Sequence, residues 1–226
     1  MMNELLDKEI LKKIFVEKNK LKIDNFFKDS YAEILYSYLS NNKDWNLSTG
    51  IDKNKYEKKN IPQLNNINTL QIKNVNNAFS KDQFSYIFNR FMNGTNMSIH
   101  EYSLRQLLNS KDFINNLNDI TGLELTKLTT LFASKYKPGN FLSPHSDKGN
   151  GRLAFVINLT KNWKPQYGGN LHFMNETRTE IIDTIVPSFN NLFIFYVPEE
   201  KGIPHYVSHV VNGIKYNRYA ITGWFE

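Results

Sequence analysis

Residues 152–159 read RLAFVINL and residues 192–197 read LFIFYV. Short runs this rich in β-branched and aromatic residues are typical of β-strands. Five further runs have the same character: LTTLFAS (128–134), NLHFM (170–174), IIDTIV (181–186), HYVSHV (205–210) and YNRYAITGWF (216–225). Turn-forming residues such as Gly-Asn-Gly at 149–151 separate them. With a short strand at the His-Ser-Asp segment, residues 145–147, the number of strands is eight, which predicts a jelly roll or barrel.

The first half of the chain differs in texture and reads mainly as helices. Helices are expected around residues 5–15, over SYAEILYSYLSNN (30–42), over KDQFSYIFNRFMN (81–93) after a capping Ser80, and as one helix or a pair within 99–119. The Asn- and Lys-rich stretch 42–70 is expected to be a loop, with a short strand at 69–73. The helices have no chemically suggestive residues, so they are expected to form an outer layer against a sheet.

These patterns predict an α+β chain with a mainly β core. We expect a single domain over residues 1–226, in which residues 1–125 form a mainly helical support region. Residues 126–226 are expected to form the strand core that contains the active site. In this interpretation the N-terminal helical layer packs on one sheet of a jelly roll.

The composition excludes several classes of site. The 226 residues include no cysteine, so disulfides and thiolate ligands are excluded, and a transition-metal site must use His and carboxylate ligands. No apolar run approaches the roughly 20 residues that cross a bilayer. The charged N-terminus is unlike a signal peptide, so a cytoplasmic protein without membrane association is expected. The net charge of +6 comes from scattered lysines, which favours an ordinary solvated surface over a nucleic-acid site.

A candidate metal site lies at His145-Ser146-Asp147. Side chains alternate along a strand, so His145 and Asp147 point to the same side and can reach one ion. An imidazole and a carboxylate, completed by a second imidazole, form the facial triad of non-haem Fe(II) oxygenases. The plain alternative is an incidental His and Asp on a surface loop.

The third ligand is expected from His205 or His209, which lie four residues apart in one predicted strand. Residues at this spacing on a strand share a face. The Asn212-Gly213 pair is typical of a two-residue hairpin turn. In such a hairpin Val207 lies opposite Arg218, which puts Arg218 on the same face as both histidines.

An interior arginine beside a metal site needs an anionic partner. A guanidinium forks onto a carboxylate through two parallel hydrogen bonds, and the far carboxylate of 2-oxoglutarate fits Arg218 if the 2-oxo acid end chelates iron. A structural ion pair is the alternative role for Arg218. His205 begins the predicted strand, directly after Pro204. If iron binds at this open end, Arg218 lies deeper in the interior than the metal, which suits a ligand that enters with its metal-binding end outward. His205 is therefore favoured as the third ligand. His209 stays as the alternative, since the sequence specifies the hairpin register only loosely.

The ordered combination of these segments resembles a known family. The residues concerned are YKPGNFLSPHSDKGNGRLAFVINLTKNW (136–163), GGNLHF (168–173), PSFNNLFIFYV (187–197), and HYVSHV and NRYAITGWF within 205–225. Together they resemble the prolyl 4-hydroxylase-like branch of the 2-oxoglutarate/Fe(II)-dependent oxygenases, most closely its ribosomal-protein prolyl hydroxylase subgroup. The resemblance covers residues 126–226 and implies a double-stranded β-helix, which is a jelly roll, with helices packed on one sheet.

The resemblance also implies roles for individual residues. It matches His145, Asp147 and His205 to the iron ligands, and Arg218 to the residue that holds the far carboxylate of 2-oxoglutarate. Other branches of the family space the histidine and the arginine more tightly, which would favour His209. Fe(II) as cofactor, with 2-oxoglutarate and O2 as reactants, is implied in the same way.

Four more positions match residues around the cosubstrate in the family. Tyr136 matches a tyrosine that often hydrogen-bonds the cosubstrate. Asn158 stands where the family often has a tyrosine touching the far carboxylate, and its amide has a shorter reach. Leu171 and Trp224 match positions that commonly line the pocket. For Tyr136, Leu171 and Trp224, ordinary packing in the core is the alternative.

The implied function is a dioxygenase that hydroxylates an unactivated C–H bond, with a prolyl residue of a protein or peptide as the expected substrate. Free proline, another amino acid or a small metabolite are alternative substrates. A cupin-like metal-binding protein without 2-oxoglutarate turnover is an alternative class, because a fold by itself does not specify chemistry.

Overall fold

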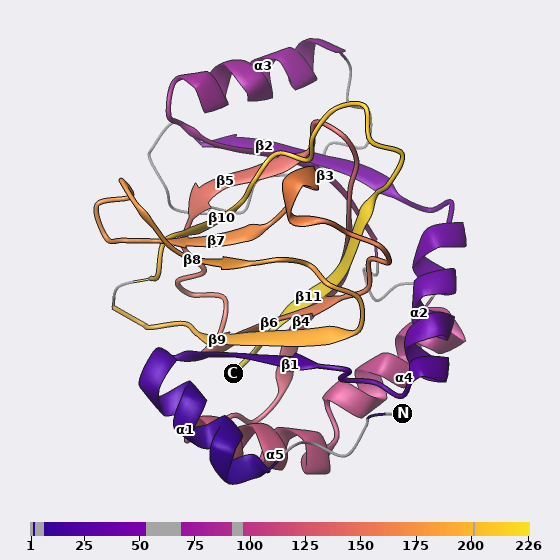
Figure 1. Ribbon diagram of the computed structural model, residues 1–226, viewed down its shortest axis with the longest axis vertical. Coiled ribbons are helices and arrows are strands. Elements are labelled where there is room, and N and C mark those ends of the chain that lie inside the picture. The colour runs from indigo at the N-terminus through magenta and orange to yellow at the C-terminus, as the bar shows by residue number, and fades with distance from the viewer. Residues whose placement is uncertain (1, 3–6, 53–68, 92–96, 201) are drawn as a thin grey trace.

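The structure is a computed structural model that describes residues 2, 7–52, 69–91, 97–200 and 202–226. Its strands form one strongly curled antiparallel sheet that bends into two facing layers (Figure 1). The larger layer contains, in spatial order, β1 (Lys20–Asp24), β9 (Asn191–Tyr196), β6 (Leu153–Asn158), β11 (Arg218–Phe225), β4 (Leu128–Tyr136) and β3 (Phe84–Phe91). The smaller layer contains β5 (Phe141–His145), β10 (His205–Val207), β7 (Leu171–Met174) and β8 (Ile181–Ile185).

Strand β3 joins the two layers. It pairs with β4 through residues 89–91 and with β5 through residues 86 and 87, and β2 (Asn46–Asp52) pairs with it over residues 84–90. The eight strands β4 to β11 correspond to the eight strands predicted after residue 125, and together with the facing layers they confirm the jelly-roll core.

Four helices cover the outer face of the larger layer. They are α1 (Lys8–Lys18), α2 (Asp29–Asn41), α4 (Ile99–Leu108) and α5 (Lys111–Thr121), and Figure 1 shows them together beneath that layer. Their apolar side chains form one hydrophobic cluster with the sheet, in which Phe15, Leu35 and Leu104 pack with Phe155 and Phe225. The predicted helical layer on one sheet is confirmed for these four helices.

A second cluster fills the space between the two layers. Phe173 and Val207 of the smaller layer meet Phe88, Phe132 and Trp224 of the larger layer there. Strand β6 is buried on both faces because it lies between this cluster and the helices. Burial on both faces explains the unbroken apolar run at residues 153–157, since neither face has to be polar.

Three predictions for the first half of the chain are wrong. Residues 46–52 form strand β2, within the stretch 42–70 that was expected to be a loop. Residues 84–91 form strand β3 and not the expected helix, and residues 69–80 form helix α3 (Thr69–Ser80) and not a strand. Strand β3 is buried on both faces over most of its length, so its apolar residues do not alternate with polar ones. An apolar run of this length fits either period, and here the pairing with β2, β4 and β5 decided the outcome.

The division at residue 125 is therefore not a structural boundary. Strands β1 and β3 of the first half belong to the same sheet as β4 to β11, and β2 extends its edge. Helix α3 also departs from the expected single layer, since it packs on β2 and β3, away from the other helices (Figure 1).

The predicted hairpin between the His205 strand and the Arg218 strand is also wrong. Strand β10 ends at Val207 and pairs with β5 and β7, whereas β11 begins at Arg218 and pairs with β4 and β6. Instead of continuing the strand, residues 208–211 hydrogen-bond to residues 139–140 and 167–170. The segment 208–217, which includes the turn at 212–213, thus connects the two layers.

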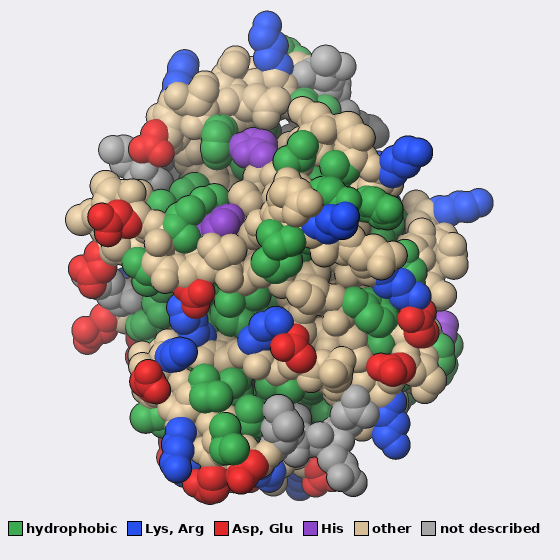
Figure 2. Space-filling view, in the orientation of Figure 1, with side chains coloured by type: hydrophobic (Ala, Val, Ile, Leu, Met, Phe, Trp, Pro, Cys, Tyr) green, Lys and Arg blue, Asp and Glu red, His purple; other side chains and the backbone are tan. Residues whose placement is uncertain are grey.

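The surface has no gathering of one charge sign on the face drawn in Figure 2, where basic and acidic side chains lie interspersed. Within the described part of the chain, no helix is both long enough and apolar enough to cross a bilayer.

Asn190 ties the N-terminal segment to the sheet. Its Oδ1 accepts a hydrogen bond from Phe27 N (2.9 Å), and its Nδ2 donates to Phe27 O (2.8 Å). Its φ of 58° is one that glycine also adopts without strain. We expect Asn190→Gly to lower the free energy of unfolding by about 1–3 kcal/mol, because two hydrogen bonds to buried backbone groups are lost. Chemical denaturation measures this change.

The matched control is Asn162→Gly. Asn162 has a similar φ of 56° but is exposed. Its substitution should leave stability nearly unchanged. Equal losses in the two variants would contradict the role assigned to the Asn190 side chain.

Candidate active site

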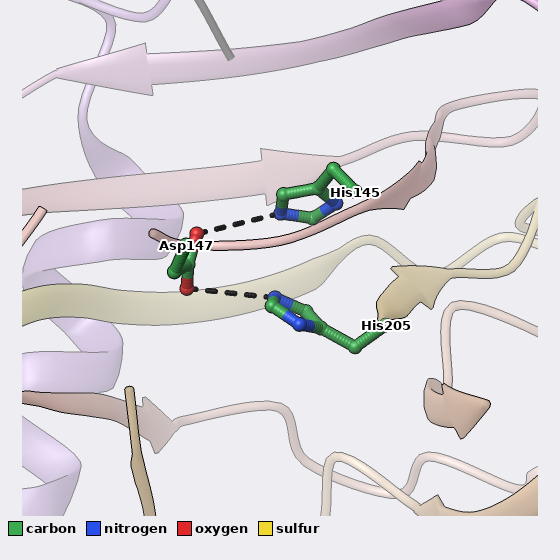
Figure 3. Close-up of side chains that lie close together, drawn as sticks. All are labelled: His145, Asp147 and His205. Atoms are coloured by element: carbon green, nitrogen blue, oxygen red, sulfur yellow. Dashed lines mark ion pairs between the residues drawn. The ribbon is translucent and has the colours of Figure 1, made fainter. Parts of the chain in front are cut away.

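Three potential metal ligands converge between the layers. His145 is the last residue of β5, and the pairing of β5 with β10 sets His205 directly opposite it. Asp147 follows two residues after His145, in the turn beyond the strand. One ligand atom from each of the three residues lies within 4.8 Å of the others, and their side chains point toward one another (Figure 3).

The carboxylate of Asp147 lies between the two imidazoles. Its Oδ1 is 3.5 Å from His145 Nε2, and its Oδ2 is 3.4 Å from His205 Nε2. All three residues are buried, with exposed fractions of 2% to 5%. Imidazole and carboxylate groups taken out of water need partners, and a divalent cation bound by all three would supply one.

Backbone carbonyls orient both imidazoles. His145 Nδ1 lies 3.0 Å from Ser143 O, and His205 Nδ1 lies 2.8 Å from Ile203 O. A carbonyl oxygen only accepts hydrogen bonds, so each Nδ1 carries a proton, and in the neutral ring Nε2 is then the nitrogen that can bind a metal. Metal-binding histidines commonly use this arrangement, in which one ring nitrogen donates to a carbonyl and the other binds the metal.

The turn after β5 brings Asp147 back toward the strands. Asn150 N donates to Asp147 O (3.0 Å), and Gly149 at the tip has a φ of 82°. The sequence interpretation placed both ligands on one strand. The structure ends the strand at His145, so this turn and not strand alternation brings the carboxylate to the imidazoles.

Arg218 is a buried cation in the same cavity. It is 3% exposed, and its guanidinium carbon lies 4.9 Å from the ring centre of Tyr136, which is its partner in the pairing of β11 with β4. Burial lowers the pKa of Arg218, an effect that Tyr136 opposes. No carboxylate of the described chain pairs with Arg218, and its Nε is buried without a hydrogen-bond partner. A buried cation of this kind calls for an anionic ligand.

Tyr136 keeps its proton next to Arg218. Burial raises the pKa of its hydroxyl to about 12, although the nearby Arg218 guanidinium opposes the rise. Near neutral pH the hydroxyl is therefore protonated and can donate a hydrogen bond to an anion bound beside Arg218.

The cavity that contains these groups lies between the two layers. Its empty volume, counted to its open side, is about 760 Å³. His145, Asp147, His205, Arg218 and Tyr136 all line it, and so do Leu171 and Trp224 as predicted, together with Tyr86, Phe88, Arg90 and Phe132. Tyr86, Phe88 and Arg90 come from β3 and were missed because residues 81–93 were expected to form a helix. Phe132 lies in the strand predicted at 128–134 but was not singled out. Read with a period of two, residues 84, 86, 88 and 90 would have been placed on one face.

Two predicted residues lie elsewhere. Asn158 is not among the residues that line the cavity, and its amide donates to Asn191 Oδ1 (3.0 Å). His209 also lies outside the lining, where its ring stacks on Phe141 at 4.1 Å between ring centres and meets Phe79 edge-on at 4.6 Å. The strand ends before His209, so the expected shared face with His205 does not exist.

The donor set fits a divalent transition metal. Two imidazole nitrogens and one carboxylate approach from one side, which is the ligand pattern of non-haem Fe(II) sites. Residues 131–226 match the family model described as the 2OG-Fe(II) oxygenase superfamily. Over these residues, which are less than half of the chain, the protein is similar to the 2OG-Fe(II) oxygenases. The match bears out the resemblance found in the sequence.

Two curated proteins are similar to part of this chain. Prolyl 3-hydroxylase OGFOD1 of Mus musculus is 30% identical over 131 residues, which are 56% of this chain and 23% of that protein. The Xenopus laevis protein of the same name is 32% identical over 132 residues, which are 56% of this chain and 25% of that protein. The alignments thus span about a quarter of the length of these relatives.

Solved structures share the fold of the whole chain. A prolyl-4-hydroxylase from Pseudomonas putida superposes with a TM-score of 0.62 at 15% identity, over 97% of this chain and 98% of that one. A prolyl hydroxylase from Trichoplax adhaerens, solved with a peptide fragment of hypoxia inducible factor, gives a TM-score of 0.62 at 18% identity, over 96% and 88% of the two chains. Identities this low establish a common fold and nothing further.

The two histidines can be distinguished by metal binding. Loss of a residue that only hydrogen-bonds a metal ligand typically weakens metal binding by about 10- to 100-fold. We expect His205→Ala to weaken Fe(II) binding by more than this, because one of the three converging donors is itself removed. His209→Ala is the matched control and should leave Fe(II) affinity unchanged, with only a small loss of stability from the missing ring stack. Anaerobic calorimetric titration measures both. Loss of binding in His209→Ala alone would contradict the ligand set.

Proposed function

We propose that this chain is an Fe(II)- and 2-oxoglutarate-dependent dioxygenase that hydroxylates a prolyl residue in a protein or peptide. The observation that carries the proposal is the joint presence, in one cavity, of three converging metal ligands and a buried arginine without a carboxylate partner. The metal ligands alone would suit many metalloproteins. Arg218 adds the requirement for a ligand with a negatively charged end.

Each part of the cofactor and cosubstrate has a candidate partner. His145, Asp147 and His205 would hold Fe(II), and Arg218 would hold the far carboxylate of 2-oxoglutarate through a forked pair of hydrogen bonds. Bound together, Fe(II), 2-oxoglutarate and O2 supply the oxidising power for hydroxylation, with decarboxylation of 2-oxoglutarate to succinate.

The chain's own residues bind, orient and shield the reactants. Arg218 neutralises the far carboxylate, and the protonated Tyr136 hydroxyl beside it can donate a further hydrogen bond. The carbonyls that accept from the two imidazoles keep their Nε2 atoms directed at the metal position. The aromatic and aliphatic walls exclude water, which strengthens these polar interactions.

A prolyl substrate is supported by the relatives and by the walls of the cavity. Both curated relatives are named as prolyl 3-hydroxylases, and one structural neighbour was solved with a peptide fragment. The cavity is walled by Phe88, Phe132, Leu171, Val207 and Trp224, which suit an apolar five-membered ring. Free proline, another amino acid or a small metabolite are the alternative substrates of the same site.

A cupin-like metalloprotein without 2-oxoglutarate turnover is the alternative class. It would use the three metal ligands but would have no need of a buried Arg218 without a carboxylate partner. Anaerobic titration of the apo protein with Fe(II) and 2-oxoglutarate separates the two classes. The weak visible charge-transfer band of an Fe(II)–2-oxoglutarate chelate is expected for the oxygenase. A folded protein that binds Fe(II) and gives no band contradicts the proposal.

The role of Arg218 can be tested with paired 2-oxo acids. The wild-type protein should bind 2-oxoglutarate more tightly than 2-oxopentanoate, which has the same chain length but lacks the far carboxylate. We expect Arg218→Gln to weaken 2-oxoglutarate binding by about 10- to 100-fold, since a charge-assisted hydrogen bond contributes roughly 1.5–3 kcal/mol. Binding of 2-oxopentanoate should change little. Competition titrations against the charge-transfer band measure both affinities, and an unchanged preference in Arg218→Gln would rule out this role.

A further inference from the structure

A second arginine, Arg90, lines the cavity besides the residues assigned to the metal and the cosubstrate. Arg90 lies on β3 opposite Ser134 of β4, and its side chain points to the face that forms the cavity wall. Its guanidinium carbon lies 4.3 Å from the ring centre of Phe132. This cation–π contact holds the guanidinium against one wall but uses none of its N–H donors.

The donors of Arg90 have no acceptor within the described part of the chain. No hydrogen bond from Arg90 to a described residue occurs, and its Nε is buried without a partner. Burial lowers the pKa of Arg90, an effect that Tyr86 opposes, and no carboxylate contributes to it. A half-buried cation in this state loses hydration that the protein does not replace.

Arg90 and Arg218 occupy different depths. Arg218 is 3% exposed, whereas Arg90 is only partly buried. Along β4 their positions are two residues apart, because Arg218 pairs with Tyr136 and Arg90 with Ser134. The deeper guanidinium is adjacent to Tyr136, and Arg90 is the more exposed of the two.

The formal charges point to one more anion. In the proposed complex, the divalent metal and Arg218 are balanced by Asp147 and by the two carboxylates of 2-oxoglutarate. One of those carboxylates belongs to the metal chelate and the other to Arg218, so neither is left for Arg90. The remaining positive charge is that of Arg90, in the cavity that receives the substrate.

We propose that Arg90 binds a carboxylate of the substrate and thereby determines specificity. The inference rests on the proposed function and narrows its substrate class to prolyl compounds with a negative charge close to the target ring. The carboxylate has two possible sources. It is either the side chain of an Asp or Glu next to the target residue in a peptide, or the α-carboxylate of a terminal or free proline. Arg90 binds and positions the substrate, and takes no part in proton transfer.

The test uses matched acid and amide probes on the Mn(II)-loaded protein with 2-oxoglutarate, where binding is measured without turnover. One pair is N-acetyl-L-proline and N-acetyl-L-prolinamide. The other is a set of proline peptides with Asp at each flanking position in turn, against the same peptides with Asn. A preference for the first pair's acid identifies an α-carboxylate, and a preference for one Asp peptide identifies a side chain. We expect the preferred acid to bind about 10- to 100-fold more tightly than its amide.

Arg90→Gln should abolish this preference and leave 2-oxoglutarate affinity unchanged. Arg90→Lys should retain only part of it, because an ammonium lacks the planar fork. Lys12→Gln, which removes the same charge from the exposed face of α1, should behave as wild type. Thermal melting of each variant verifies that it is folded.

The contrary outcomes are distinct. If wild-type protein binds 2-oxoglutarate but treats acids and amides alike in both sets, including by binding neither, the role of Arg90 is overturned and the proposed function stands. The role is also overturned if Arg90→Gln keeps the preference or weakens 2-oxoglutarate binding instead. If the metal-loaded wild type fails to bind 2-oxoglutarate, the proposed function fails, and this inference fails with it.

Discussion

The pairing of β5 with β10 is the constraint on which the site depends. It sets His145 opposite His205, so that two imidazoles from distant parts of the chain face one cavity. A shift of one residue in this register would turn one imidazole to the other face of the sheet, because side chains alternate along a strand. The short β10 is held on its other side by β7, with His205 opposite Phe173, so the register is determined by two neighbours and not by a hairpin.

Burial between the two layers gives the polar groups of the site their chemical character. The carboxylate of Asp147 and the guanidinium of Arg218 are both at most 5% exposed, in a space otherwise walled by aromatic and aliphatic side chains. Charges removed from water in this way destabilise the protein unless they are neutralised. The ligands that would neutralise them are the metal and the cosubstrate of the proposed reaction. Binding of these ligands would therefore offset the unfavourable free energy of burying the charges.

The same two-sided burial explains where the sequence was misleading. Strands whose two faces are both covered need no polar residues, so the alternation that distinguishes strand from helix is lost. Strand β6 was still recognised, because its apolar run is short and lies between turn residues. Strand β3 was mistaken for a helix, and for this reason Phe88 and Arg90 were not predicted to line the cavity.

The sequence by itself determined the strand-rich second half and the His145–Asp147 pair. These features are local, since they depend on residue type and on spacing along the chain. Arg218 was selected through a hairpin that does not form, and it reaches the cavity because β11 pairs with β4 and β6. Tertiary structure alone decided that His205 and not His209 meets the other two ligands, that Asn158 lies outside the cavity, and that Arg90 lies within it. Those outcomes depend on which strands pair and where each strand ends, and such long-range pairing is set by the packing of the whole sheet.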